Sequence, residues 1–167
     1  DLLKFEFFFP DRERFLADLR EEISFHAPDW DEHIGAGPAA IHALVRRFRP
    51  LSAHRVARPF LESYRVVAES LLRWGTEKPV DKGELMSRAL ALGKQWLLQQ
   101  RIRGAESVSK SYFETALRLA DNRKLLGAGA GDLDERRRHL VAEIAGAIRR
   151  IDAIDALAAA RRSGIES

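Results

Sequence analysis

Residues 51–72, LSAHRVARPFLESYRVVAESLL, decide the fold class of this chain. Apolar residues recur in this stretch at i, i+3, i+4 and i+7, the spacing that places them on one face of an α-helix. Ser52 is suited to cap this helix and Gly75 to end it, and Pro59 predicts a kink or a fresh start within it. The predicted buried face, centred on its two aromatic residues, consists of Val56, Ala57, Phe60, Leu61, Tyr64, Val67, Ala68, Leu71 and Leu72.

The stretches on both sides of residues 51–72 carry the same helical spacing. Each begins at a capping Asp or Ser, or at a proline in the first helical position. Further helices are therefore expected to begin at Asp11, at Pro38, at Asp81 with Glu84, at Ser111 with Glu114 and at Asp132 with Glu135. Gly127 is expected to close the helix that starts at Ser111. The predicted buried residues are Phe15, Leu16, Leu19, Ile23, Ile41, Leu44, Val45, Phe48, Leu85, Ala89, Leu92, Trp96, Leu97, Phe113, Ala116, Leu117 and Ala120.

Two stretches depart from the helical pattern. Residues 24–37 contain the clusters HAPD and GAGP and are interpreted as a loop. Residues 2–9 form a short apolar run that fits a buried strand or the end of a helix equally well. Trp74 and Trp96 are expected in the core, and Trp30 is expected to pack onto it. The chain is therefore predicted to be all-α, a bundle of about six helices, with either a short strand or a helix end at its N-terminus.

A glycine-rich run, GAGAGD at residues 127–132, separates the last helix from the others. The predicted organisation is a helical domain over residues 1–127, a Gly-rich linker over residues 128–131 and a long helix over residues 132–162. The long helix carries a 4–3 spacing at positions 133, 137, 140, 144, 147, 151, 154 and 158, and all of these except Arg137 are Leu, Ile or Ala. Such spacing is typical of a helix that docks along another one. We expect it to dock on the rest of the domain or on a partner.

The composition is that of one ordinary domain, with 167 residues of which 46% are hydrophobic and 32% charged. No uncharged stretch approaches the roughly 20 residues that a membrane-spanning helix needs. The absence of cysteine excludes disulfides and thiolate metal sites. A net charge of +3 is a weak indication of nucleic-acid binding. Because an apolar run follows directly on Asp1, the chain is expected to be a piece of a longer protein.

One short stretch, FHAPDWDEH at residues 25–33, suggests catalysis. His26 and Asp31 have the HxxxxD spacing of glycerolipid acyltransferases, in which the His removes a proton from the attacking hydroxyl and the Asp orients the imidazole. The same stretch could hold a metal ion through His26, Asp31 and His33. The glycine run at residues 127–132 could cradle a phosphate, but a helix precedes it where the dinucleotide-binding motif needs a strand. It is therefore interpreted as a flexible joint.

Clusters of cations are the other candidate binding features. Three arginine clusters could contact lipid headgroups or acidic protein surfaces, and they are also typical of solvated helix ends. They comprise Arg46, Arg47 and Arg49, then Arg136, Arg137 and Arg138, and finally Arg161 and Arg162. The helix predicted after Ser111 is a candidate reader of nucleic acid, which predicts a steep salt dependence of DNA binding. Its cations are Lys110, Arg118, Arg123 and Lys124.

Four stretches resemble a known family when they are read together. They are LLKFEFFFPDRERFLADL, LSAHRVARPFLESYRVVAESLL, KGELMSRALALGKQWLLQQRI and SKSYFETALRLADNRKLLG. In this order they resemble the C-terminal helical region of bacterial membrane-bound glycerol-3-phosphate acyltransferases, over residues 1–127. The resemblance implies a parent enzyme that esterifies the first hydroxyl of glycerol 3-phosphate. The acyl chain would come from acyl-CoA or acyl carrier protein, and the product would be lysophosphatidate.

The resemblance also changes the interpretation of His26 and Asp31. In the family, HxxxxD begins the acyltransferase core, and an arginine-rich block, an EGxRSR-like block for the glycerol phosphate and a proline-containing block follow. This sequence contains none of those blocks. The core is therefore expected upstream of Asp1, and the His26–Asp31 spacing is interpreted as a coincidence.

The resemblance thus implies a segment that is inactive alone, with no catalytic, cofactor-binding or metal-binding residues. Its expected partners are the upstream core and, through that core, the acyl donor and glycerol 3-phosphate. It would brace the core, with residues 2–10 as the joint, in a peripheral protein on the cytoplasmic side of the inner membrane. A helical protein-interaction module and, less favoured by the charge, a nucleic-acid-binding bundle are the alternatives.

Overall fold

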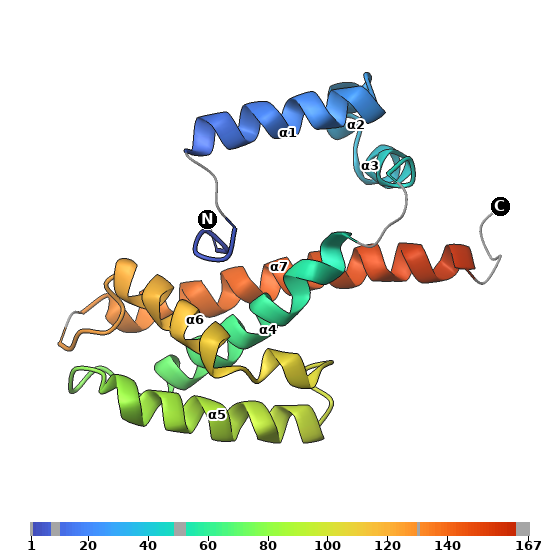
Figure 1. Cartoon of the computed structure of the whole chain (residues 1–167). Coiled ribbons are helices and arrows are strands. Elements are labelled where there is room, and N and C mark those ends of the chain that lie inside the picture. Colours follow the sequence, from blue (N-terminus) through green and yellow to red (C-terminus); the bar gives the residue numbers. More distant parts are fainter. Residues whose placement is uncertain (1, 8–10, 49–52, 130, 163–167) are drawn as a thin grey trace. The chain divides into compact units, whose positions relative to one another are not determined.

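The computed structural model describes residues 2–7, 11–48, 53–129 and 131–162. Over these ranges the fold is all-α, as predicted, with no strand. Residues 2–6 form turns, so within the described residues neither the strand nor the helix end expected at the N-terminus is present. The described helices (Figure 1) are α1 (Arg12–His26), α2 (Trp30–Gly35), α3 (Pro38–Val45), α4 (Ala53–Leu72), α5 (Lys82–Leu98), the 3₁₀ turn η1 (Ala105–Ser107), α6 (Lys110–Asn122) and α7 (Leu133–Arg162).

The chain divides into two compact units, which are described separately. Unit 1 comprises Asp1–Glu6 and Arg55–Asp152, and unit 2 comprises Phe7–His54 and Ala153–Ser167. Unit 1 therefore contains α5, η1, α6, nearly all of α4 and the larger part of α7. Unit 2 contains α1, α2 and α3.

Helix α4 is buried on nearly all sides, which is typical of a central helix. The predicted face is confirmed at Leu61, Tyr64, Val67, Ala68 and Leu71, and Glu62, Ser63, Val66 and Ser70 on other faces are buried as well. The prediction was wrong at the N-terminal end of that face: Val56 is 59% exposed, and Phe60 is only half-buried. Pro59 lies inside a continuous helix, so no fresh start occurs there. Ser52, the predicted cap, lies outside the described residues.

Helices α5, α6 and α7 supply the rest of the core of unit 1. Trp74 and Trp96 are buried in it as predicted. Gly93 of α5 allows α6 to come close, because a Cβ at this position would lie 3.2 Å from a methyl group of Val108 and 3.3 Å from Cζ of Phe113. The further members of the core include Leu85, Ala89, Leu92, Ala116, Leu117, Leu119, Ala120, Leu133, Leu140, Ile144, Ile148 and Ile151, with Leu2, Leu3 and Phe5 packed against them.

The ends of α5 and α6 test the predicted capping residues. Asp81 caps α5, since its Oδ1 accepts a hydrogen bond from the backbone N–H of Glu84 at 2.7 Å. Helix α6 begins two residues earlier than predicted, with Ser109 at its N-cap position, so the assignment of Ser111 was wrong. It also ends at Asn122, well before Gly127. Lys124 adopts the left-handed conformation there, with φ 55°, and takes the place usual for glycine in this type of helix end.

Helix α7 is the long helix expected to start at Asp132. Its predicted docking positions are buried at Leu133, Arg137, Leu140, Ile144, Ile151 and Ala158. Charged residues lie between these buried positions along α7. None of the helices in the described ranges is long and apolar enough to cross a membrane.

Unit 2 departs from prediction at two points. The loop expected over residues 24–37 contains α2, whose first turn carries acidic side chains that favour a helix N-terminus. The helix expected after Asp11 is present, and Asp11 caps it through the backbone N–H of Arg14 at 2.7 Å. However, α1 has no buried residue, and Phe15 and Leu19 are each 42% exposed. Pro38 begins α3 as predicted.

Candidate functional site

His26 and Asp31, the residues of the HxxxxD motif, have separate polar partners in unit 2. His26 lies in the last turn of α1, and its Nε2 is 3.2 Å from Oε1 of Glu22. Asp31 lies in the first turn of α2, where its Oδ1 accepts from the backbone N–H of Glu32 at 3.0 Å. An imidazole that is to act as a general base needs an orienting partner and room for a substrate hydroxyl. The contacts observed for His26 do not supply the Asp31 partner that the motif requires.

His33 is held by its own surroundings. Its Nδ1 lies 3.0 Å from the carbonyl oxygen of Asp29, and its Nε2 lies 3.3 Å from Nη2 of Arg47. Arg47 also pairs with the carboxylate of Asp29, and this hydrogen bond lowers the pKa of Asp29. Both ring nitrogens of His33 are thus engaged. Across the described ranges no three His, Asp or Glu side chains are grouped as a metal ion would require.

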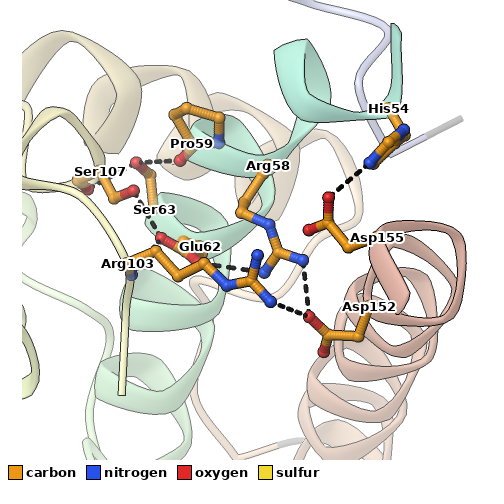
Figure 2. A network of polar contacts seen from close by, with 9 residues as sticks. All are labelled: His54, Arg58, Pro59, Glu62, Ser63, Arg103, Ser107, Asp152 and Asp155. Atoms are coloured by element: carbon orange, nitrogen blue, oxygen red, sulfur yellow. Dashed lines mark hydrogen bonds and ion pairs between the residues drawn. The ribbon is translucent and has the colours of Figure 1, made fainter. Parts of the chain in front are cut away.

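A buried polar cluster in unit 1 surrounds the carboxylate of Glu62 (Figure 2). Only 5% of the Glu62 side chain is exposed. Its Oε2 accepts hydrogen bonds from the hydroxyl of Ser107 at 2.7 Å and from the backbone N–H of Arg103 at 3.1 Å. The hydroxyl of Ser63 lies 2.6 Å from the carbonyl oxygen of Ser107. Because a buried carboxylate is stable only when hydrogen-bonded, these contacts fasten the connection between α5 and α6 to α4.

Two arginines extend this cluster to α7. Nη2 of Arg58 donates to Oδ1 of Asp152 at 2.6 Å, and Nη2 of Arg103 donates to the same oxygen at 3.1 Å (Figure 2). Arg58 also lies 3.4 Å from Oε1 of Glu62. Burial acts to lower the pKa of Arg58, but the two carboxylates outweigh burial and the net effect raises this pKa. The cluster therefore holds charged groups that join α4, α7 and the α5–α6 connection.

Arg137 is a second buried cation of unit 1, with 1% of its surface exposed. Its Nε and Nη2 donate to the carbonyl oxygen of Leu125 at 3.0 and 2.8 Å, and Nη2 also reaches the carbonyl of Gly127 at 3.3 Å. Its Nη1 donates to the carbonyl of Gly75. Burial lowers the pKa of Arg137. The forked guanidinium thus connects α7 to the turn that follows α4 and to the segment that follows α6.

Unit 2 contains a different His–Asp pair from the one the sequence suggested. Nε2 of His54 lies 2.7 Å from Oδ1 of Asp155, and their side chains are 7% and 13% exposed (Figure 2). A carboxylate that orients an imidazole is also found beside general bases. With so little of His54 exposed, a substrate could not reach the ring, and the pair is interpreted as a structural contact between the start of α4 and α7.

An open pocket of about 400 Å³ lies between α5 and α6 in unit 1. Met86 and Leu117 give it an apolar lining, and Gly83 adds no side chain. Its charged residues are Lys82, Lys110, Glu114 and Arg118. Pockets of this size commonly take small molecules or part of a larger ligand. In this pocket, cationic side chains lie beside an apolar surface.

Most other cations singled out in the sequence form ion pairs. Arg123 of the predicted DNA-reading helix pairs with Glu143 of α7 at 2.5 Å, and this hydrogen bond lowers the pKa of Glu143. Arg136 and Arg138 pair with Asp132 and Asp134, each four residues earlier in the chain, at 3.7 and 2.5 Å. These contacts are typical of solvated helix faces. Arg49 and the side chains of Arg161 and Arg162 lie outside the described part of the chain.

Comparison with known proteins identifies the family. Residues 1–129 match the family described as "Glycerol-3-phosphate acyltransferase C-terminal region". The chain belongs to this family. It is 42% identical over 159 residues to proteins named "Putative acyltransferase plsB1" from Mycobacterium bovis and from two strains of Mycobacterium tuberculosis. These matches cover 95% of this chain, which spans about a quarter (25%) of the length of the curated relatives. No solved structure matches the chain.

The family match confirms the resemblance drawn from the four sequence stretches. The buried cluster around Glu62, however, was not predicted. Its signal was present in α4, where Arg58 and Glu62 are four residues apart and Glu62 directly follows an apolar position. Two opposite charges at i, i+4 are usually read as a solvated pair. Only the folded chain shows that Ser107 and Asp152 meet them.

Proposed function

We propose that the chain is the C-terminal helical region of a longer glycerol-3-phosphate 1-O-acyltransferase. The observation that carries the proposal is the match of residues 1–129 to this region of the family, in a chain that spans 25% of its acyltransferase relatives. An upstream core would transfer an acyl chain from acyl-CoA or acyl carrier protein to the sn-1 hydroxyl of glycerol 3-phosphate. The product would be lysophosphatidate, an intermediate of phospholipid synthesis.

In this proposal the segment braces the core and takes no part in the chemistry. Support comes from the polar groups of Glu62 and Arg137, which are directed at the backbone and side chains of unit 1 itself. Leu2, Leu3 and Phe5 pack against the core of unit 1, so an upstream domain would be joined to a fixed point. The division into residues 1–127, a linker at 128–131 and a docking helix at 132–162 belongs to the same proposal.

The proposal includes a peripheral location on the cytoplasmic side of the inner membrane, which rests on the resemblance. The second candidate function is a helical protein-interaction module. It is favoured by the exposed apolar side chains of unit 2, where Phe15 and Leu19 are 42% exposed and Phe25 is 81% exposed. The two candidates differ in what precedes Asp1 in the gene. HxxxxD and EGxRSR-like blocks there support the acyltransferase, and their absence supports the interaction module.

The role of His26 provides the enzymatic test. In the longer protein, His26→Ala should leave acyl transfer to glycerol 3-phosphate within a few-fold of the parent, because His26 pairs with Glu22. His139→Ala, another exposed His on a helix, is the matched control. Alanine in place of the upstream motif histidine should cost about 100-fold or more, the scale for a lost general base. A comparable loss in a folded His26→Ala protein would show that this segment is catalytic.

A further inference from the structure

The pocket between α5 and α6 has an apolar lining with cationic side chains beside it. Met86 and Leu117 line it with apolar atoms, and Lys82, Lys110 and Arg118 place cations beside them. Long cationic side chains often lie along apolar surface and keep their charged ends at its edge. The pocket therefore offers an apolar surface next to three positive charges and one negative charge, that of its single carboxylate.

The cations of the pocket are held only by weak contacts. Lys82 lies 2.8 Å from Asp121, but the two side chains are 60% and 57% exposed. Lys110 lies 3.8 Å from Glu114, and these side chains are 73% and 58% exposed. Exposed pairs of this kind contribute little and exchange readily with another anion. The guanidinium of Arg118 lies 4.9 Å from the centre of the Phe5 ring. Because this ring is neutral, the contact does not neutralise the positive charge of Arg118.

We propose that this pocket binds the phosphate headgroup of one anionic phospholipid at a bilayer surface. The phosphate would lie on Lys82, Lys110 and Arg118, and the glycerol and first methylenes would cover Met86 and Leu117. The proposal rests on the peripheral membrane location in the proposed function and adds the site and the lipid class. Clustered basic residues beside a bilayer are attracted to anionic lipids.

The apolar lining favours a lipid over a free phosphate. A free phosphate could pair with the cations but would leave Met86 and Leu117 in water. The wider charge of unit 1 favours an anionic surface over a single soluble anion, since this unit carries twenty Lys and Arg against fifteen Asp and Glu. An excess of positive charge brings a protein toward an anionic membrane before any specific contact forms.

The test measures binding of the full 167-residue chain to vesicles of phosphatidylcholine, with and without phosphatidylglycerol. We expect binding only to the anionic vesicles, and a loss of about tenfold or more in the variant Lys82→Glu/Lys110→Glu. The control Lys94→Glu/Lys124→Glu changes the net charge by the same amount with two exposed lysines that do not line the pocket. It should lose less than about threefold, because neither lysine lines the pocket.

Each alternative occupant predicts a different result. Equal losses in both charge variants would mean diffuse adsorption, and no binding to anionic vesicles would also overturn the proposal. Release of the protein from the vesicles by glycerol phosphate, but not by a simple salt of the same ionic strength, would assign the pocket to a soluble phosphate. Met86→Gln should weaken vesicle binding several-fold while Met86→Leu should not, and equal behaviour of the two would remove the apolar half of the site.

Folding is checked by thermal melting, and Lys82→Gln/Lys110→Gln replaces the Glu variant if that variant is destabilised. The vesicle experiment contains no acyl donor and no glycerol 3-phosphate. A negative result would therefore leave the acyltransferase proposal standing. Conversely, a failed acyl-transfer test would not affect the measured lipid binding.

Discussion

The two units of this chain bury their apolar side chains to very different extents. In unit 1, Phe113 and Leu85 are completely buried, and helices from four parts of the sequence contribute to one core. In unit 2, Phe25 is 81% exposed and Ile34 is 53% exposed. Within the part of unit 2 that the structure describes, the buried hydrophobic residues are Ala27, Leu44 and Ala158. Unit 1 therefore draws stability from its own contacts, whereas the apolar faces of unit 2 are suited to contact something else.

The difference shows what helical periodicity can predict. Both units carry apolar residues at helical spacing, and both form helices. The spacing identifies the face that favours burial, but it does not identify the surface that buries it. The charges differ as well: unit 2 carries eight Lys and Arg against ten Asp and Glu, while unit 1 has an excess of cations. An acidic unit with exposed apolar helices is suited to a protein contact more than to an anionic membrane.

The largest effect should come from the same substitution made in each unit. Phe113→Ala in unit 1 removes a side chain with 0% exposure and should cost about 3–5 kcal/mol of unfolding free energy. Phe25→Ala in unit 2 removes a side chain that is 81% exposed and should change stability by less than about 0.5 kcal/mol. Far-UV circular dichroism follows the helices of both units during denaturant unfolding, and tryptophan fluorescence in a Trp30→Phe background reports unit 1 alone through Trp74 and Trp96.

A comparable loss in both variants would contradict the contrast between the units. It would mean that Phe25 is covered in solution by a surface that protects it as fully as the core protects Phe113. Phe60→Ala gives an intermediate case, because Phe60 is half-buried against the ring of Tyr112 at 4.6 Å. Its cost should fall below that of Phe113→Ala.

A second pair of substitutions compares polar contacts in the two units. Glu62→Gln keeps the shape of a buried side chain but leaves Arg58 with a weaker partner, and should cost about 2–3 kcal/mol. Glu22→Gln in unit 2 alters a carboxylate that is 72% exposed beside His26, and should change stability by less than about 0.5 kcal/mol. Thermal and denaturant unfolding of both variants decide the point. If Glu62→Gln were neutral, the cluster would not fasten the α5–α6 connection.

Much of the fold could be predicted from the sequence because its strongest signals are local. The caps at Asp11 and Asp81 and the proline at the start of α3 act on neighbouring residues, and all three are confirmed. The errors arise where two residues could fill the same role in a helix end and the less usual one does so. Lys124 takes the left-handed position that was assigned to Gly127, and the hydrogen bonds from the backbone N–H groups of Lys124 and Leu125 to Asp121 and Ala120 close the helix there.

The candidate sites were harder to predict because they depend on distant residues. HxxxxD was a pattern of spacing alone, and the chain instead places His26 beside Glu22. The Glu62 cluster joins residues of α4 to partners that are 41 to 94 positions away, and no spacing rule connects them. The pocket is similar, since Met86 and Leu117 were predicted as helix residues and only the packing of α5 on α6 brings them together with the lysines.

The smallest expected effect concerns pH and again compares one carboxylate from each unit. Glu143 in unit 1 has its pKa lowered by the hydrogen bond from Arg123, and Asp29 in unit 2 has its pKa lowered by Arg47. A carboxylate with a depressed folded-state pKa stabilises the protein above its unfolded pKa and loses this contribution as pH falls through the folded value.

Glu143→Gln should therefore reduce the unfolding free energy near neutral pH by about 0.5–1 kcal/mol, since the pair with Arg123 is partly exposed. The difference from the parent should disappear well below pH 4.5, where Glu143 is protonated in both states. Asp29→Asn should show the same direction of pH dependence, but salt should abolish its effect first because the Asp29 side chain is the more exposed of the two, 41% against 33%. Unfolding of the three proteins across this pH range at low and high salt measures both differences. A deficit in Glu143→Gln that persisted at low pH would show that the glutamate stabilises unit 1 through its packing and not through its charge.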